Sequence, residues 1–120
     1  MKNIFLVDDS PHLVENLCRL IKSIPGLVCS GSVGSVVKAV DVIIYNRPDI
    51  IILDISLEDG CGIDIIQSIK KELPGCVIIM FTNHNNEVFQ KKSISLGANY
   101  FLDKTKDIER LIDVLKILAK

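Results

Sequence analysis

The sequence predicts an α/β fold, a doubly wound parallel sheet of five strands with five helices. Short, continuous apolar runs, typical of strands buried on both faces, alternate with longer segments whose apolar residues recur at helical spacing. Proline, glycine and polar turn residues separate these segments. The chain has 120 residues, of which 48% are apolar, and this composition suits one globular domain and excludes disorder or a collagen-like fibre. Such alternation calls for right-handed crossovers between parallel strands.

The first unit of the chain is a strand, an acidic turn and a helix. Residues 4–7 form a continuous apolar run, which Asp8 and Asp9 end. Ser10-Pro11 then combines a helix N-cap with a preferred first helical residue, and the helix continues to Pro25-Gly26. The residues of this helix expected to face inward are Leu13, Leu17, Leu20, Ile21 and Ile24.

The second unit repeats this pattern. We expect a strand over residues 27–33, a helix from Ser35 to about Asn46, and a third strand over residues 50–53. Residues 47–49, Arg-Pro-Asp, separate that helix from the third strand. The inward-facing residues expected for the helix are Val36, Val37, Val40, Ile43 and Ile44, and Tyr45 and Tyr100 are interpreted as packing residues.

The third unit begins with Asp54 and a polar, glycine-containing loop over residues 56–62. A helix follows and ends before Pro74-Gly75, and residues 77–81 form a fourth strand that ends at Thr82. The inward-facing residues expected for this helix are Ile65, Ile66, Ile69 and Leu73.

The last part of the chain contains the weakest helix of the five. Its apolar pattern from about Asn86 to Leu96 is thin, and Gly97 closes it as a left-handed cap. A short fifth strand over residues 100–102 and a final helix with a clean apolar stripe follow. The main apolar contacts expected for these two helices are Val88, Phe89 and Leu96 in the first and Ile108, Leu111, Ile112, Leu115 and Leu118 in the second.

Charge and hydropathy exclude several classes of protein. The formal net charge is -1, without the basic excess that phosphate neutralisation requires, so no direct contact with nucleic acid is expected. No apolar run approaches the length of a membrane span, and the N-terminus lacks the apolar stretch of a signal peptide. The sequence therefore predicts a protein that is not exported and has no membrane partner.

The four cysteines are Cys18, Cys29, Cys61 and Cys76, and they form no C-x-x-C pair. Structural zinc ligands normally come in closely spaced pairs. We therefore interpret the cysteines as small buried hydrophobic residues, with a redox or zinc role as the alternative. Reduced thiols would imply a cytoplasmic protein.

Polar residues follow four of the five predicted strands, and all of them fall on one edge of the sheet. Asp8 and Asp9 follow the first strand, Asp54 the third, Thr82 the fourth and Lys104 the fifth. Ligands of open parallel sheets bind beyond the carboxyl ends of the strands. A lone aspartate after a strand is usually a turn former, but the coincidence at several strand ends favours a site.

Three converging carboxylates would repel one another, and a hard divalent cation would resolve the repulsion. Magnesium is the natural candidate because it prefers oxygen ligands and keeps waters for a phosphoryl ligand. A magnesium ion beside a carboxylate, a hydroxyl and a lysine suits phosphoryl transfer onto the carboxylate. Asp54, which follows the most apolar strand, is favoured as the nucleophile, and Asp8 and Asp9 then hold the metal.

Five motifs in this order resemble the receiver (CheY-like) domains of two-component response regulators. They are Leu-Val-Asp-Asp-Ser at 6–10, Ile-Leu-Asp-Ile-Ser at 52–56, Gly62, Phe-Thr-Asn at 81–83 and Gly-Ala-Asn-Tyr-Phe-Leu-Asp-Lys at 97–104. The resemblance covers the whole chain and implies a single receiver domain over residues 1–120. It also implies a flavodoxin-like sheet with strand order 2-1-3-4-5.

The resemblance implies a role for each residue of the acidic motifs. Asp54 would be phosphorylated by a histidine kinase or a phosphotransfer protein. Asp9 would bind Mg²⁺ directly and Asp8 chiefly through water, with Asp54 and the backbone carbonyl of Ser56 as further ligands. Transfer from a phosphodonor and self-dephosphorylation are expected, but no separate substrate is turned over, so the chain is not expected to be an enzyme.

The resemblance also implies a switch. Thr82 would donate its hydroxyl to the phosphoryl group, and Lys104 would pair with that group. Phe101 matches the aromatic residue whose rotamer reports the activated state, and a packed core aromatic is the alternative. The switch surface would consist of the fourth helix, the fifth strand and the fifth helix, where a weakly anchored element can hold two arrangements.

Three residues depart from the family pattern. Glu58 and Thr105 stand where proline is common, and Asn83 stands where a small residue is usual. The Lys104-Thr105 bond could therefore be cis or trans, since a cis bond without proline costs roughly 3 kcal/mol. His84 is interpreted as a solvated side chain, with tuning of the phosphoryl lifetime as the alternative.

Two other functions are weighed against the phosphorylation switch. The first is a phosphorylation-independent interaction module that dimerises through the fourth or fifth helix. Loss of Asp54 or Lys104 would indicate such a module, but both residues are present. The second is a metal-dependent phosphohydrolase, which normally needs an aspartate two residues beyond the nucleophile, where this chain has Ser56. The expected downstream partner is an effector protein or an output domain absent from this chain, with a homodimer as a further possibility.

Overall fold

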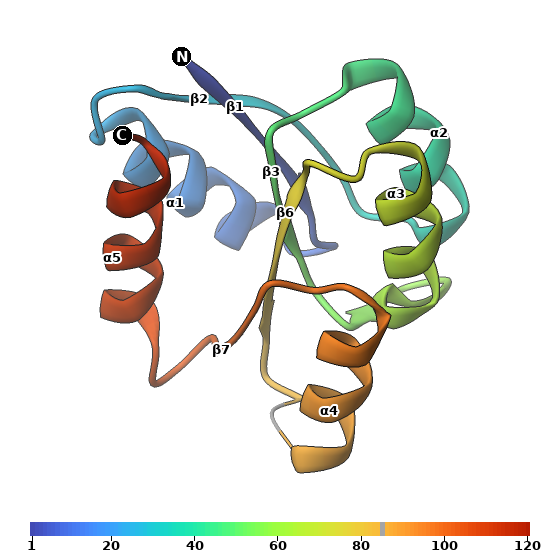
Figure 1. Ribbon diagram of the computed structural model, residues 1–120. Helices are drawn as coiled ribbons and strands as arrows, with labels where there is room; N and C mark the ends of the chain where they lie inside the picture. Colours follow the sequence, from blue (N-terminus) through green and yellow to red (C-terminus); the bar gives the residue numbers. More distant parts are fainter. Residues whose placement is uncertain (85) are drawn as a thin grey trace.

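The computed structural model describes residues 1–84 and 86–120 and has the predicted doubly wound architecture (Figure 1). Its main sheet contains the parallel strands β1 (Lys2–Val7), β2 (Leu27–Val33), β3 (Ile50–Leu53), β6 (Val77–Thr82) and β7 (Tyr100–Asp103). These strands lie in the order β2-β1-β3-β6-β7. Counted along the chain within this sheet, the order is 2-1-3-4-5, as the family resemblance implies.

Helices cover both faces of the sheet (Figure 1). One layer consists of α1 (Pro11–Lys22) and α5 (Ile108–Leu118), and the other of α2 (Val36–Asn46), α3 (Ile66–Glu72) and α4 (Glu87–Leu96). Neighbouring strand residues face opposite layers: Ile4 and Leu6 belong to the apolar cluster with α1 and α5, whereas Phe5 and Val7 belong to the other. The strands are therefore buried on both faces, which explains their continuous apolar runs.

The segment after β3 is more ordered than the polar loop predicted over residues 56–62. It forms a two-stranded antiparallel hairpin, β4 (Ser56–Leu57) and β5 (Gly60–Cys61), followed by the 3₁₀ helix η1 (Gly62–Ile65). The loop prediction was wrong because the segment contains one strongly apolar side chain, Leu57, which is buried in the core and anchors the hairpin. The α-helical part of the third helix begins only at Ile66.

Several predictions of inward-facing residues were wrong. Val37 is 76% exposed and Tyr45 is 92% exposed, because Ala39 and Ile43 carry the packing of α2. In a helix with 3.6 residues per turn, side chains two positions apart point to opposite sides. Val37 therefore points away from the side of Ala39, and Tyr45 away from the side of Ile43. Val88 in α4 and Ile108 in α5 are also exposed, and α1 ends at Lys22, although Ile24 is buried beyond its end. Tyr100 is half-buried.

Helix α4 is weakly anchored, in agreement with its thin apolar pattern. Every residue of α4 is described, and the only fully buried one is a serine, Ser93. Its hydroxyl has no hydrogen-bond partner within the described residues. The remaining core contacts of α4 are made by Phe89 and Leu96, which are half-buried. Asn86 caps the start of the helix, where its Oδ1 accepts a hydrogen bond from the backbone N–H of Phe89 (2.9 Å).

Replacing Ser93 by alanine is expected to stabilise the protein. A buried hydroxyl without a partner retains its desolvation cost, and Ser93→Ala removes that cost, so we expect a gain of about 1 kcal/mol in the free energy of unfolding. Urea denaturation followed by circular dichroism measures the change. Ser95→Ala is the matched control, because Ser95 lies on the exposed side of α4 and its hydroxyl donates to the Lys92 carbonyl (2.8 Å), so it reports the helix propensity of alanine together with the loss of an exposed hydrogen bond. Equal effects of the two substitutions would contradict a cost at Ser93.

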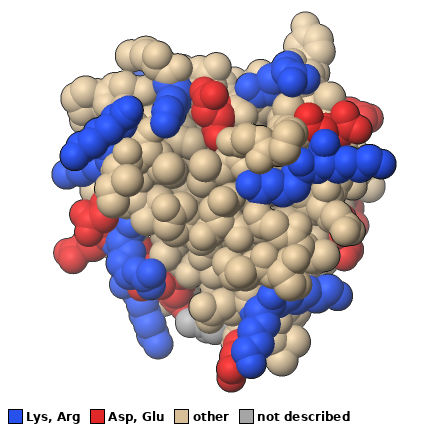
Figure 2. All heavy atoms as spheres, viewed as in Figure 1, with Lys and Arg blue, Asp and Glu red and all other residues tan. Residues whose placement is uncertain are grey.

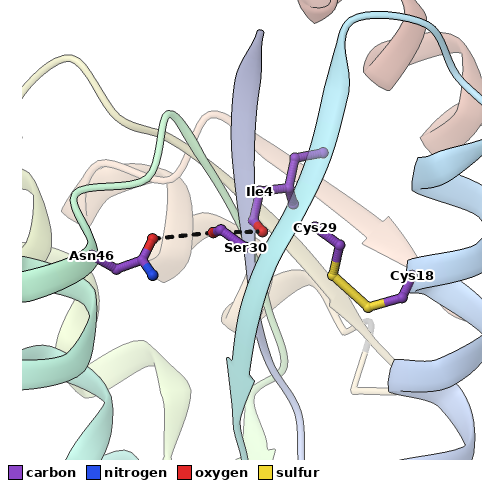
Figure 3. Close-up of a disulfide and its surroundings, with 5 residues drawn as sticks. All are labelled: Ile4, Cys18, Cys29, Ser30 and Asn46. Atoms are coloured by element: carbon purple, nitrogen blue, oxygen red, sulfur yellow. Dashed lines mark hydrogen bonds between the residues drawn. A yellow bond between two sulfur atoms is a disulfide. The ribbon is translucent and has the colours of Figure 1, made fainter.

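A disulfide joins Cys18 in α1 to Cys29 in β2 (Figure 3). The prediction of reduced thiols was therefore wrong for these two residues, whereas Cys61 and Cys76 are free thiols and Cys76 is buried. Burial raises the pKa of the Cys76 thiol to about 11. The pairing was not visible in the sequence because it depends on how α1 folds back along β2, which brings the two Cα atoms to 5.7 Å.

The same stretch of β2 is also held from its other side. The register between β1 and β2 shifts at Ser30, which is the extra residue between the pairs Ile4↔Cys29 and Phe5↔Gly31. The Ser30 hydroxyl contacts both the Ile4 carbonyl oxygen and Asn46 Oδ1, each at 3.1 Å (Figure 3). The edge strand β2 is thus fixed to α1 by the disulfide and to α2 by a hydrogen bond.

None of the helices in residues 1–84 and 86–120 is long and apolar enough to cross a membrane.

Candidate functional site

The carboxyl ends of β1, β3 and β7 meet at one edge of the sheet. The backbone N–H of Asp54 donates to the Val7 carbonyl (2.9 Å), and that of Lys104 donates to the Thr82 carbonyl (3.1 Å). The parallel hydrogen bonding thus continues one residue beyond the ends of β3 and β7. This continuation brings the predicted polar residues to the same edge, because each directly follows a paired strand.

The three aspartates form a compact acidic cluster. Asp8, Asp9 and Asp54 each offer an oxygen, and these oxygens lie within 4.8 Å of one another. Asp8 and Asp54 are buried, while Asp9 is exposed. Lys104 Nζ lies 2.8 Å from Asp8 Oδ2 and 2.8 Å from Asp54 Oδ2. One ammonium among three carboxylates leaves a charge of about -2 when all are ionised, which a divalent cation would neutralise.

The ionisation of the cluster reflects two opposing effects. Burial raises the pKa of Asp8, and its hydrogen bond with Lys104 only partly offsets this. Burial lowers the pKa of Lys104, but hydrogen bonds to Asp54 and Asp8 outweigh burial, and the pKa is raised. Lys104 therefore stays protonated and holds the two buried carboxylates together.

One oxygen of Asp54 is suited to a cation. Asp54 Oδ2 accepts a hydrogen bond from Lys104, but Oδ1 is buried and has no hydrogen-bond partner in the described part of the chain. A buried carboxylate oxygen without a partner is costly. The donor set consists of carboxylate oxygens, which Mg²⁺ prefers. These residues fit a magnesium ion.

Gly62 fits tightly against the nucleophile candidate. A Cβ atom at this position would overlap the backbone carbonyl oxygen of Asp54. The close approach of residue 62 to the Asp54 backbone therefore requires glycine. The backbone N–H of Gly62 also donates to the Ile55 carbonyl (2.6 Å). A second glycine, Gly34, lies beside Asp9, where a Cβ would be 3.1 Å from the Asp9 Cα. Both glycines allow close approach to the acidic cluster.

Thr82 lies at the end of β6 and is fully buried. Its Oγ1 accepts a hydrogen bond from the backbone N–H of His84 (3.1 Å). His84 is exposed, as its interpretation as a solvated residue requires, but its ring also packs edge-on against Phe89 with centroids 6.0 Å apart. Phe101 is half-buried and packs against the cluster beneath α2, α3 and α4. Asn83 is exposed.

The turn after Lys104 depends on Asp103, a residue that the sequence analysis did not single out. The Lys104-Thr105 bond is trans. Asp103 Oδ1 accepts hydrogen bonds from the hydroxyl of Thr105 (2.6 Å) and from the backbone N–H groups of Thr105 (2.7 Å) and Lys106 (3.0 Å). These bonds, led by the Thr105 hydroxyl, lower the pKa of Asp103. An aspartate side chain that accepts from the backbone two residues further on is a turn signal, and here it fixes the backbone at Thr105, where the family resemblance leads us to expect proline.

Comparison with known proteins decides the family. The sequence model of the response regulator receiver domain family matches residues 4–116. The chain belongs to the response regulator receiver domain family. As a receiver domain, it is a signalling module of a two-component system, and such domains are generally not enzymes.

The relatives of this receiver domain include transcriptional regulators. The DNA-binding transcriptional activator DevR/DosR of Mycobacterium tuberculosis is 30% identical over 109 residues, which cover 91% of this chain and 49% of that protein. The uncharacterized transcriptional regulatory protein YxjL of Bacillus subtilis is 26% identical over 98% of this chain and 54% of its own length. The chain thus spans about half the length of the curated relatives it matches.

Solved structures have the same fold. A LuxR-family two-component response regulator from Aurantimonas has a TM-score of 0.90 at 27% identity, covering 99% of this chain and 85% of that one. The response regulator domain of Thermotoga maritima CheB has a TM-score of 0.86 at 23% identity, covering 99% of this chain and 93% of that one. The flavodoxin-like (CheY-like) fold predicted from the sequence is confirmed.

Proposed function

We propose that this receiver domain is a phosphorylation switch in which Asp54 accepts a phosphoryl group from a histidine kinase or a phosphotransfer protein. The observation that carries the proposal is the environment of the Asp54 carboxylate. One oxygen pairs with Lys104 and the other is buried without a partner in the described chain. Asp54 is thus held in place by a cation on one side and has a free oxygen on the other.

The proposed reaction is a displacement at phosphorus. A carboxylate oxygen of Asp54 attacks the phosphorus atom and forms a new O–P bond. The bond from phosphorus to the donor's imidazole nitrogen breaks, and the imidazole leaves with its electron pair. Lys104, which lies within reach of Asp54, would then pair with the phosphoryl oxygens, and the hydroxyl of Thr82 would donate to them.

The metal site assigned by this proposal includes Asp8, Asp9, Asp54 and the backbone carbonyl of Ser56. A bound Mg²⁺ supplies positive charge that offsets the negative charge of the transferred group. The support for Asp8, Asp9 and Asp54 is their convergence within 4.8 Å. The support for Ser56 is its position two residues after Asp54, at the start of the hairpin that leaves the site.

The proposed output surface consists of α4, β7 and α5, with Thr82 and Phe101 as the link from the site. Its support is the weak anchoring of α4, the next helix along the chain after β6. In Figure 1, β7 crosses in front of β6, with α5 and α4 on either side of it. Figure 2 shows the same view, with uncharged residues across the middle and charged side chains of both signs toward the margin. A downstream protein, an output domain or a second copy of the chain would bind here.

The proposal is tested by phosphorylation in vitro. The protein is incubated with Mg²⁺ and acetyl phosphate, and its intact mass is measured. We expect an adduct of about 80 Da, the mass of a phosphoryl group, and no adduct for Asp54→Asn or after chelation of the metal. Asp41→Asn is the control, because Asp41 is exposed on α2 and should leave the adduct unchanged.

Two results would contradict the proposal. An adduct that persists in Asp54→Asn would place phosphorylation elsewhere. The absence of any adduct on the native protein, from acetyl phosphate or from a phosphorylated histidine kinase, would favour the phosphorylation-independent interaction module instead.

A further inference from the structure

The tip of the β4-β5 hairpin contacts two different parts of the protein. Its two residues are Glu58 and Asp59. Glu58 lines an open cavity of about 370 Å³ together with Asp8, Asp9 and residues of α1. Asp59 binds instead to the start of α2. The hairpin tip therefore lies between the acidic cluster and a helix that contributes no residue to that cluster.

The carboxylate of Asp59 caps α2 from outside the helix. It accepts hydrogen bonds from the Ser35 hydroxyl (2.6 Å) and from the backbone N–H groups of Val36 (2.7 Å) and Val37 (3.3 Å). The Ser35 hydroxyl in turn accepts from the backbone N–H of Lys38 (3.3 Å). These N–H groups have no partner inside the helix, and an anionic acceptor is favourable at a helix N-terminus. The hydrogen bonds, led by that from Ser35, also lower the pKa of Asp59.

The base of the hairpin is fixed to the nucleophile candidate. Gly62 lies against the carbonyl of Asp54, and its backbone N–H donates to Ile55. Between base and tip, Leu57 is buried in the core. Ser56 lies between these fixed points. Its backbone position is thus set by Asp54 and Gly62 at one end of the hairpin and by Asp59 at the other.

We propose that Asp59 is a positioning residue for the metal site. By clamping the hairpin tip to the first turn of α2, Asp59 holds the Ser56 carbonyl and the Glu58 carboxylate at the rim of the Asp8, Asp9 and Asp54 cluster. The role rests on the proposed function, because it presumes that this cluster binds Mg²⁺. The Asp59 carboxylate bonds to the start of α2 and is not part of the acidic cluster. Its effect passes through the backbone of residues 56–58.

The test is the affinity of the folded protein for Mg²⁺, measured by isothermal titration calorimetry. We expect Asp59→Ala to weaken binding by about 10-fold, the lower end of the effect seen when supporting residues around metal ligands are removed. Asp59→Asn should lose less, because its amide oxygen can still accept one backbone hydrogen bond. Circular dichroism establishes a temperature at which every variant is folded.

Asp49→Ala is the matched control. Asp49 is also exposed and also accepts a backbone hydrogen bond, from the N–H of Asn3 (2.8 Å), but it lies where β3 begins, at the opposite edge of the sheet. It should leave the Mg²⁺ affinity unchanged. If Asp59→Ala only lowers the unfolding midpoint and keeps the native affinity, Asp59 is a helix cap alone and the positioning role is wrong.

Failure of the positioning role and failure of the proposed function give different results. Native protein that binds Mg²⁺ and is phosphorylated on Asp54, together with an Asp59→Ala variant of equal affinity, overturns only the role of Asp59. Native protein that binds no Mg²⁺ overturns both. A weakened affinity in Asp59→Ala that Asp59→Asn partly restores supports the inference.

Discussion

Reduction of the Cys18-Cys29 disulfide is expected to lower the free energy of unfolding by about 3 kcal/mol. The two cysteines are 11 residues apart in the chain, and closing a loop of this size restricts the unfolded chain by about that amount in the chain-entropy account. Denaturation by urea, with and without a thiol reductant, measures the difference. The lost stability should appear as a lower urea midpoint with little change in slope.

A double variant separates the disulfide from other effects of the reductant. Cys18→Ala with Cys29→Ala should unfold at nearly the same urea concentration with and without reductant. Cys61 and Cys76 are free thiols, so they give the reductant no other bond to break in the folded protein. If the native protein is equally stable in both conditions, the disulfide does not contribute the expected stability.

The sequence predicted the architecture well because the signals for it are local. Residues 50–53 are an uninterrupted apolar run, and a run of this kind is buried on both faces wherever it lies in a parallel sheet. Asp54 and Lys104 were placed at one edge for a related reason. All strands of a parallel sheet end on the same side, so the residue that follows each strand is placed there by topology alone.

The features that the sequence did not predict depend on contacts between elements distant in the chain. Nothing in the sequence singled out Asp59, because its partners belong to the first turn of α2, more than 20 residues earlier. The Cys18-Cys29 disulfide was not predicted for the same reason, since it forms only where α1 packs along β2. For Tyr45 the sequence predicted a packing contact that the structure lacks, because an aromatic residue at the margin of an apolar stripe packs only if a neighbouring element covers it.

Replacing Gly62 by alanine is expected to destabilise the protein by about 3 kcal/mol or more. The added Cβ would overlap the carbonyl oxygen of Asp54, and overpacking of a core typically costs about 1 to 3 kcal/mol and occasionally more. Neither partner can easily move. The backbone N–H of Asp54 is bonded to Val7, and the N–H of Gly62 is bonded to Ile55. Relief of the overlap therefore requires breaking a ladder hydrogen bond or displacing the hairpin.

Gly75→Ala is the matched control, because a Cβ on Gly75 would meet no described atom within 4 Å. Urea denaturation should show a large loss for Gly62→Ala and a change within about 0.5 kcal/mol for Gly75→Ala. Since the overlap falls on the backbone of Asp54, the surviving folded fraction of Gly62→Ala should also form less aspartyl phosphate from acetyl phosphate. Equal stability of the two variants would mean that residues 54–62 can shift without cost, and the hairpin could not then fix the geometry of the acidic cluster.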